Sequence, residues 1–156
     1  GELDEELKSF VKEDLNICHK VSFMGSLSSE QVLDELLISH VHILPSFNEG
    51  MPVANTEAMA SGLICIASKV GGLPEIIQPG VNGFLFDPKH PEQLKKILED
   101  IFFGKFNIDK ICTNARTETI AKFDQIKLSA LKQYKIFNWT HQTENRRDHN
   151  DWRKKN

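Results

Sequence analysis

Two glutamates eight residues apart are the side chains best suited to chemistry in this chain of 156 residues. Glu49 falls in a predicted loop, and Glu57 falls in the helix into which that loop opens. Small apolar residues flank Glu57, so we expect it to be buried, and a buried carboxylate needs hydrogen-bond partners. Paired sugar hydroxyls suit it, because a carboxylate accepts two charge-assisted bonds. The alternative is that Glu57 accepts from a buried donor of the protein and Glu49 is a solvated loop charge.

The start of that helix is a second feature suited to ligand binding. The segment Pro45–Gly62 begins at a predicted strand end, and Pro52 suits a first helical turn because its missing N–H would be unpaired there. Unpaired N–H groups and the helix dipole attract phosphate. Gly50 allows a ligand close to the backbone, and Gly50, Met51 and Val53 are the expected donors. Two carboxylates beside such a helix start suit a nucleotide sugar.

A pair of glycines follows the next predicted strand. Gly71 and Gly72 come after the apolar run Leu63–Ser68, and they would permit backbone contact with a ligand. A plain turn from strand to helix would use the same residues. The following Leu73-Pro74-Glu75 could equally be only a helix start with an acidic first turn.

Strands and helices alternate along the chain at the spacing of βα units. Predicted strands are Val21–Gly25, His40–Leu44, Leu63–Ser68 and Phe84–Phe86; predicted helices are Glu2–Asp14, Ser28–Ser39, Pro52–Gly62, a short one at Pro74-Glu75, Pro91–Phe103, Ile108–Glu118 and Asp124–Phe137. This α/β pattern predicts a parallel sheet with helices on both faces. Ligands of such sheets bind at the carboxyl ends of the strands, which are the loops after Leu44, Ser68 and Gly25.

Length and composition predict one ordinary globular domain, and the net charge of -3 argues against nucleic acid as the main partner. The three cysteines and the acidic residues lack metal-ligand spacing, so we expect no metal and a reducing cytoplasm. No apolar run reaches membrane-spanning length. The polar stretch 138–156 is predicted to be a disordered tail, with contact to anionic lipid headgroups as the alternative.

The order of these motifs resembles one family. Pro45-Ser46, Glu49-Gly50-Met51-Pro52, Glu57-Ala58-Met59-Ala60-x-Gly62, Gly71-Gly72-x-Pro74-Glu75 and Gly83-Phe84-Leu85 follow one another as in the C-terminal domain of retaining glycosyltransferases of family 4, also called group 1. The resemblance runs from about Val21 to Leu98 and, more weakly, to Phe137. It implies the GT-B fold, in which two Rossmann-like domains enclose the active site.

The resemblance also implies roles for individual residues. Glu49 matches the first glutamate of the E-x7-E motif, which contacts the transferred sugar, and is the implied catalytic residue. Glu57 matches the second glutamate, which holds the ribose hydroxyls. The other implied contacts are the backbone near sugar and diphosphate, the loop that grips the base, and a turn that lines the cleft. In that order, the donor-binding positions are Gly50 and Met51, Gly25 and Ser26, and Gly71 and Gly72.

As implied by the resemblance, residues 1–137 are an N-terminally truncated donor-binding domain. The family's first strand of this domain, its basic diphosphate-binding residues and its N-terminal acceptor-binding domain are missing, and Thr56 replaces a usual aliphatic residue. The implied reaction transfers sugar from a nucleoside diphosphate to an acceptor hydroxyl with retention, without cofactor or metal. We therefore expect a chain that is inactive alone, from a parent acting in polysaccharide biosynthesis, with peripheral association at the cytoplasmic membrane face. A non-enzymatic nucleotide-sugar-binding or partner module is the alternative, and a glycosidase is a third.

Overall fold

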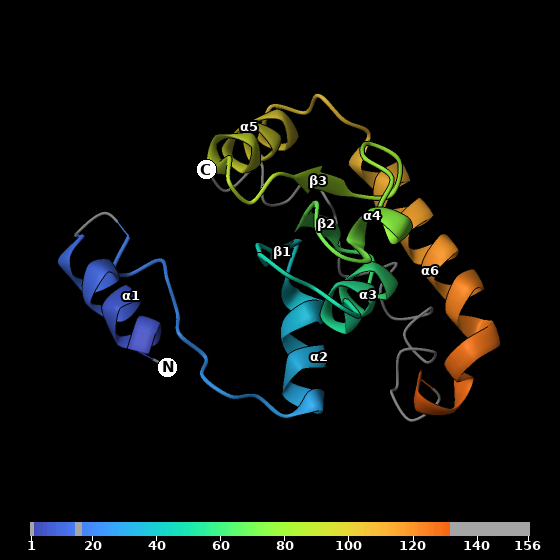
Figure 1. Cartoon of the computed structure of the whole chain (residues 1–156), viewed down its shortest axis with the longest axis horizontal. Helices are drawn as coiled ribbons and strands as arrows, with labels where there is room; N and C mark the ends of the chain where they lie inside the picture. Colours follow the sequence, from blue (N-terminus) through green and yellow to red (C-terminus); the bar gives the residue numbers. More distant parts are fainter. Residues whose placement is uncertain (1, 15–16, 132–156) are drawn as a thin grey trace. The chain divides into compact units, whose positions relative to one another are not determined.

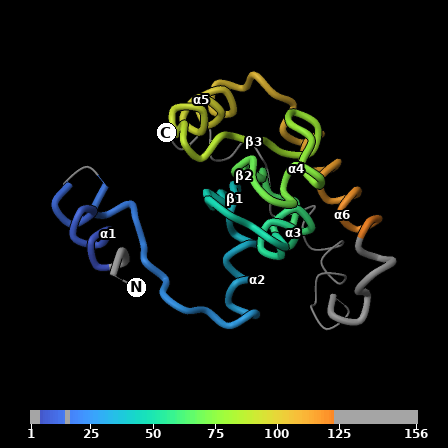
Figure 2. Tube along the Cα trace, in the orientation of Figure 1, coloured from blue at the N-terminus to red at the C-terminus, as the bar shows by residue number. Residues whose placement is uncertain are grey.

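The chain divides into two compact units, Gly1–Val32 and Leu33–Asn156. The structure, a computed structural model, describes residues 2–14 and 17–131, and side chains within residues 5–14 and 17–122 (Figures 1 and 2). The predicted tail 138–156 lies outside the described residues. Each unit is described by itself.

The first unit contains the predicted N-terminal helix but not the predicted strand. Helix α1 spans Glu2–Glu13, which confirms the prediction, and Leu7 and Phe10 of its apolar face are exposed. The prediction of a strand at Val21–Gly25 is wrong, since these residues have no regular secondary structure. A strand needs a neighbour to satisfy its N–H and C=O groups, and no strand in the described residues pairs with this segment.

Helix α2, Ser29–Ile38, begins in the first unit and continues into the second. Its start is a capping box. The Ser28 N–H donates to Gln31 Oε1 at 2.8 Å, and the Gln31 N–H donates to Ser28 Oγ at 3.3 Å. The two residues thus satisfy each other's unpaired groups at the helix start.

The second unit is built on a parallel three-stranded sheet in the order β1-β2-β3. Its strands are β1 (Val41–Leu44), β2 (Ile64–Ser68) and β3 (Phe84–Phe86). Parallel strands require crossovers, and these are made by α3 (Val53–Ala60) and α4 (Leu73–Ile76) (Figure 1). The predicted parallel sheet is therefore confirmed.

Side chains of β2 alternate between two hydrophobic cores, one on each face of the sheet. Cys65 and Ala67 face the side of α3, whereas Ile64 and Ile66 face the other side. The core on the α3 side consists of Ala58, Met59, Leu63, Cys65, Ala67, Leu73, Ile77 and Ala115. The core on the opposite side consists of Ile64, Ile66, Phe84, Phe86, Ile101, Ile108, Ile111 and Cys112. Every residue of β2 is buried, as expected for a strand covered on both faces.

Two further helices complete the described fold. Helix α5 spans Pro91–Phe102 and α6 spans Ile108–Leu131. Two separate helices were predicted in this stretch, but α6 is continuous. No glycine or proline lies between Glu118 and Asp124 to end the first predicted helix. Residues 132–137 of the second predicted helix lie outside the described residues. No helix in the described part of the chain combines the length and the apolar character needed to cross a bilayer.

Candidate functional site

The carboxyl ends of β1 and β2 are joined side by side. The two strands pair in register up to Leu44 and Ala67, and the Ser68 hydroxyl donates to the carbonyl oxygen of Leu44 at 3.4 Å. The loop of residues 45–52 and the loop of residues 69–72 therefore leave the sheet at the same edge. This is the edge at which open parallel sheets bind their ligands.

The two loops touch through their backbones. A Cβ atom built at Gly71 would lie 1.7 Å from the carbonyl oxygen of Glu49, and one at Gly72 would lie 3.3 Å from the carbonyl oxygen of Gly50. Gly71 also has a φ of +52°, a conformation that other residues adopt at a cost. The structure thus brings together four residues that the sequence analysis placed in one site.

Glu49 is half-buried at the contact between the loops. The hydroxyl of Ser46 lies 3.4 Å from Oε2 of Glu49 and donates to it. Among the described residues this long bond is the one bond to the Glu49 carboxylate, and it leaves most of the accepting capacity of the carboxylate unused.

Glu57 is half-buried on α3, and burial raises the pKa of its carboxyl group. Its carboxylate forms no hydrogen bond or ion pair with any described side chain. The alternative in which Glu57 accepts from a buried protein donor thus has no support among residues 5–14 and 17–122. A partly desolvated carboxylate without a partner is a costly arrangement, and one that an incoming donor of hydrogen bonds would relieve.

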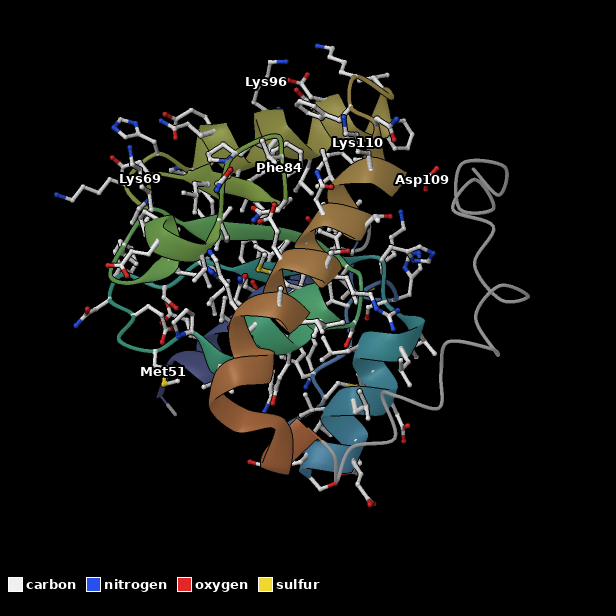
Figure 3. The ribbon with its side chains drawn as sticks, turned by 90° about the vertical axis from the view of Figure 1, so that its right-hand side faces the viewer. Met51, Lys69, Phe84, Lys96, Asp109 and Lys110 are labelled. Atoms are coloured by element: carbon white, nitrogen blue, oxygen red, sulfur yellow. The ribbon has the colours of Figure 1, made fainter. Side chains whose placement is uncertain are left out.

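The start of α3 differs in detail from the prediction. Pro52 lies immediately before the helix rather than inside its first turn, and no side chain caps it. Val53 is not a free donor, because its N–H donates to the carbonyl oxygen of Met51 at 2.8 Å. Thr56 donates to the carbonyl oxygen of Pro52 through both its N–H and its hydroxyl, each at 3.0 Å. Of the expected donors, Gly50 and the exposed Met51 remain (Figure 3).

The end of α3 is fixed by a glycine, as predicted. Gly62 has a φ of +77° and donates to the carbonyl oxygen of Met59 at 3.0 Å, while Leu63 donates to that of Ala58 at 3.1 Å. This pair of bonds is the Schellman motif. It leads the chain directly from α3 into β2, so the position of Glu57 relative to the sheet is set locally.

Gly25 and Ser26 were predicted to contact the base of the nucleotide. They belong to the first unit, and the remaining predicted residues belong to the second. Gly25 has a φ of +65° and open space around it. Its contact with the base of a nucleotide stays a prediction.

Two buried asparagines escaped the sequence analysis. Asn55 on α3 is fully buried, and its Oδ1 has no partner among the described residues. Asn82 is also buried and has three hydrogen bonds. The available signal was a polar side chain next to small apolar residues of α3 for Asn55, and an asparagine in a turn between Gly80 and Gly83 for Asn82.

An apolar hollow of about 550 Å³ lies elsewhere on the second unit. It is lined by His40, Val41 and Ile64 at the amino ends of the strands and by the end of α5 near Phe102. Because ligands of parallel sheets bind at the opposite, carboxyl ends, we assign the candidate site to the two loops and not to this hollow. Within the described residues, no group of three or more His, Cys, Asp or Glu side chains is placed to hold a metal ion.

Comparison with known proteins identifies the family. Residues 1–117 match the sequence profile described as "Glycosyl transferases group 1". The chain therefore belongs to this family, and its fold is that of a Rossmann-like C-terminal domain of the GT-B type.

Individual relatives agree with this assignment. The uncharacterized glycosyltransferase MJ1607 of Methanocaldococcus jannaschii is 32% identical over 128 residues, which cover 78% of this chain and 32% of that protein. The C-terminal domain of a glycosyl transferase group 1 family protein (LpcC) from Francisella tularensis superposes with a TM-score of 0.70 at 28% identity, over 78% of this chain and 63% of that one. Anabaena HepE in complex with UDP-glucose gives a TM-score of 0.70 at 25% identity, over 88% and 37%. The chain spans about a third of the length of the curated relatives it matches.

Proposed function

We propose that residues 1–137 are the donor-binding part of a retaining glycosyltransferase of family 4. In this proposal Glu49 contacts the transferred sugar, Glu57 accepts from the ribose hydroxyls, and the backbone near Gly50 and Gly71 lies along the sugar and diphosphate. The acceptor binds to a separate N-terminal domain outside residues 1–156, so these residues alone do not transfer sugar.

The state of Glu57 is the observation that carries the proposal. Its carboxylate is partly desolvated and has no partner in the described part of the chain. Vicinal hydroxyls of a ribose would donate two hydrogen bonds to its two oxygens. The UDP-glucose bound to the similar HepE structure supports a nucleotide sugar as the ligand class.

The position of the site agrees with the chemistry of this transfer. The leaving group is a nucleoside diphosphate, which is already a stable anion and needs charge stabilisation more than a proton donor. Glu49 and Glu57 therefore need not act as the acid and base of a glycosidase pair. Instead, Glu49 would orient the sugar through hydroxyl contacts, which favours the reactive geometry.

Calorimetric titration of the chain with UDP, GDP and ADP tests the donor site. We expect binding of one nucleotide, and we expect Glu57→Ala to weaken it by about 1–3 kcal/mol through the lost ribose bonds. Glu99→Ala is the matched control, because Glu99 is an exposed glutamate of α5. Unchanged affinity in a folded Glu57→Ala variant would remove the ribose role.

The reaction itself is tested on the chain mixed with a separately produced N-terminal domain. Proton NMR of the product reports the anomeric configuration, and we expect the configuration of the donor to be retained. An inverted product would contradict the family 4 assignment. Transfer by the chain without an N-terminal domain would contradict the proposed division of roles.

A further inference from the structure

The side chain of Asn82 forms three hydrogen bonds with described residues. Its side chain is 1% exposed. Its Oδ1 accepts from the N–H of Gln78 at 2.7 Å, and its Nδ2 donates to the carbonyl oxygen of Ile76 at 3.1 Å and to Oε2 of Glu118 at 2.6 Å. A bond from an amide to a carboxylate is charge-assisted and stronger than a neutral one.

These bonds connect the end of α4 to α6. Ile76 is the last residue of α4 and Gln78 follows shortly after it, while Glu118 lies on α6. The Asn114 side chain adds a second connection by donating to the carbonyl oxygen of Val81 at 3.0 Å. The short helix α4 is therefore fixed at its carboxyl end by polar contacts to α6.

The amino end of α4 lies at the candidate site. Gly72 immediately precedes α4, and a Cβ atom there would lie 3.3 Å from the carbonyl oxygen of Gly50. Leu73, the first residue of the helix, and Ile77, which directly follows its last residue, are both buried. A helix of a single turn packed at both ends moves as one body, so a shift at Ile76 would reach the contact between Gly72 and Gly50.

Helix α6 also contacts the other half of the site. Ala115 is fully buried in the same core as Ala58 and Met59 of α3, which carries Glu57. Figure 3 shows α6 crossing in front of α3. One helix thus packs against α3 and bonds to the segment after α4.

From these contacts we infer that Asn82 is a positioning residue, which acts with Glu118 to hold the Gly71–Gly72 turn against the backbone of Glu49 and Gly50. The inference depends on the proposed donor site for its functional meaning. Its structural content, the coupling of Asn82 to the turn, is independent of any ligand.

Amide NMR of the unliganded chain tests the coupling. Asn82→Asp removes both donated bonds and places two carboxylates at hydrogen-bonding distance. We expect the amide signals of Gly50, Gly71 and Gly72 to shift, and exchange of the Leu73 amide, which donates to Val70, to accelerate about tenfold. The double variant Asn82→Asp with Glu118→Gln should move the signals part of the way back, because the side-chain amide introduced on α6 would donate to the new carboxylate, whereas the bond to the Ile76 carbonyl oxygen stays lost.

The matched control is Asn107→Asp, the same substitution just before α6. Asn107 only accepts, from the N–H of Lys110 at 3.1 Å, so aspartate keeps its bond and the glycine signals should stay in place. Should Asn82→Asp not fold, Glu118→Ala removes the bond from Asn82 to α6 but keeps the bonds of Asn82 to Ile76 and Gln78. It should shift the same glycine signals to a smaller extent.

Two outcomes would overturn the inference. One is a change confined to residues 76–83 and 114–118, with the signals of Gly50, Gly71 and Gly72 unmoved. The other is failure of the double variant to move those signals back towards their positions in the unaltered chain. If the chain binds UDP, Asn82→Asp should also raise the Kd about fivefold, and the double variant should partly reverse this. Absence of UDP binding in the unaltered chain would count against the donor site while the NMR result still decided the coupling.

Discussion

Gly71 and Glu49 lie in backbone contact, so closely that a Cβ atom at Gly71 would stand 1.7 Å from the Glu49 carbonyl oxygen. No flexible side chain separates the two loops at this point, and only glycine fits. The contact fixes how far the loop after β2 stands from the loop that carries Glu49. Any residue larger than glycine must separate the two loops.

Gly71→Ala should be the most harmful glycine substitution in this part of the chain. Gly80→Ala is the matched control, because Gly80 also has positive φ (+77°) but open space around its α-carbon. We expect Gly80→Ala to lower the free energy of unfolding by about 1 kcal/mol through backbone strain alone. Gly71→Ala should lower it by about 1–3 kcal/mol more. Urea unfolding followed by circular dichroism measures both, and equal losses would argue against the backbone contact.

Glu57→Gln should change nucleotide binding and the stability of the chain in opposite directions. The substitution removes a partly desolvated charge without changing the shape of the side chain, so we expect the free energy of unfolding to rise by about 0.5 kcal/mol. The same variant should bind nucleotide more weakly, because its amide accepts through one oxygen only. A loss of stability without ligand would indicate that the carboxylate has a protein partner.

The bonds between Ser28 and Gln31 should be mutually dependent. Ser28→Ala should lower the free energy of unfolding by about 1 kcal/mol, the usual value of a cap. In a double-mutant cycle with Gln31→Ala, the pair should show a coupling of about 0.5 kcal/mol. Ser29→Ala, at an exposed neighbouring serine, serves as the control, and strictly additive losses would refute the reciprocal bonding.

His42 should make stability depend on pH. Its Nε2 is buried without a partner among the described residues, and burial lowers the pKa of the imidazole. The unfolded chain then binds a proton more readily below the ordinary value of about 6.5. The free energy of unfolding should therefore fall as the pH decreases through 6.5 towards the lowered pKa of the folded state.

Thermal unfolding of His42→Leu between pH 7 and pH 5.5 checks this expectation. In this variant the loss of stability with decreasing pH should largely disappear. In His19→Gln, which replaces an exposed histidine, that loss of stability should remain. Glu57 acts in the opposite direction but at lower pH, near the ordinary range of carboxyl groups. If His42→Leu loses as much stability with decreasing pH as the unaltered chain, the pH dependence comes from other groups.

The sequence predicted the parts of the fold that depend on local patterns. The buried run around Cys65 has the composition of a strand covered on both faces, and Ser28, Gln31 and Gly62 bear the signals of helix ends. The backbone loops around Glu49 and Gly71 were also expected at one edge, because carboxyl ends of parallel strands meet there.

What escaped prediction depends on contacts between distant residues. Val21–Gly25 has the composition of a strand, but composition cannot show whether a neighbouring strand is present to pair with it. The bond from Asn82 to Glu118 joins residues 36 positions apart, and neither residue type predicts that the other is its partner. The use of the Val53 N–H by Met51 is likewise a detail of loop geometry that residue types alone do not determine.

Helix α6 has a consequence for how the second unit unfolds. Cys112 belongs to the core on one face of the sheet, and Ala115, about one helical turn later, belongs to the core on the other. Neither core can lose its packing without disturbing that turn. The two layers should therefore melt together, in a single cooperative transition at one temperature rather than as separate subdomains.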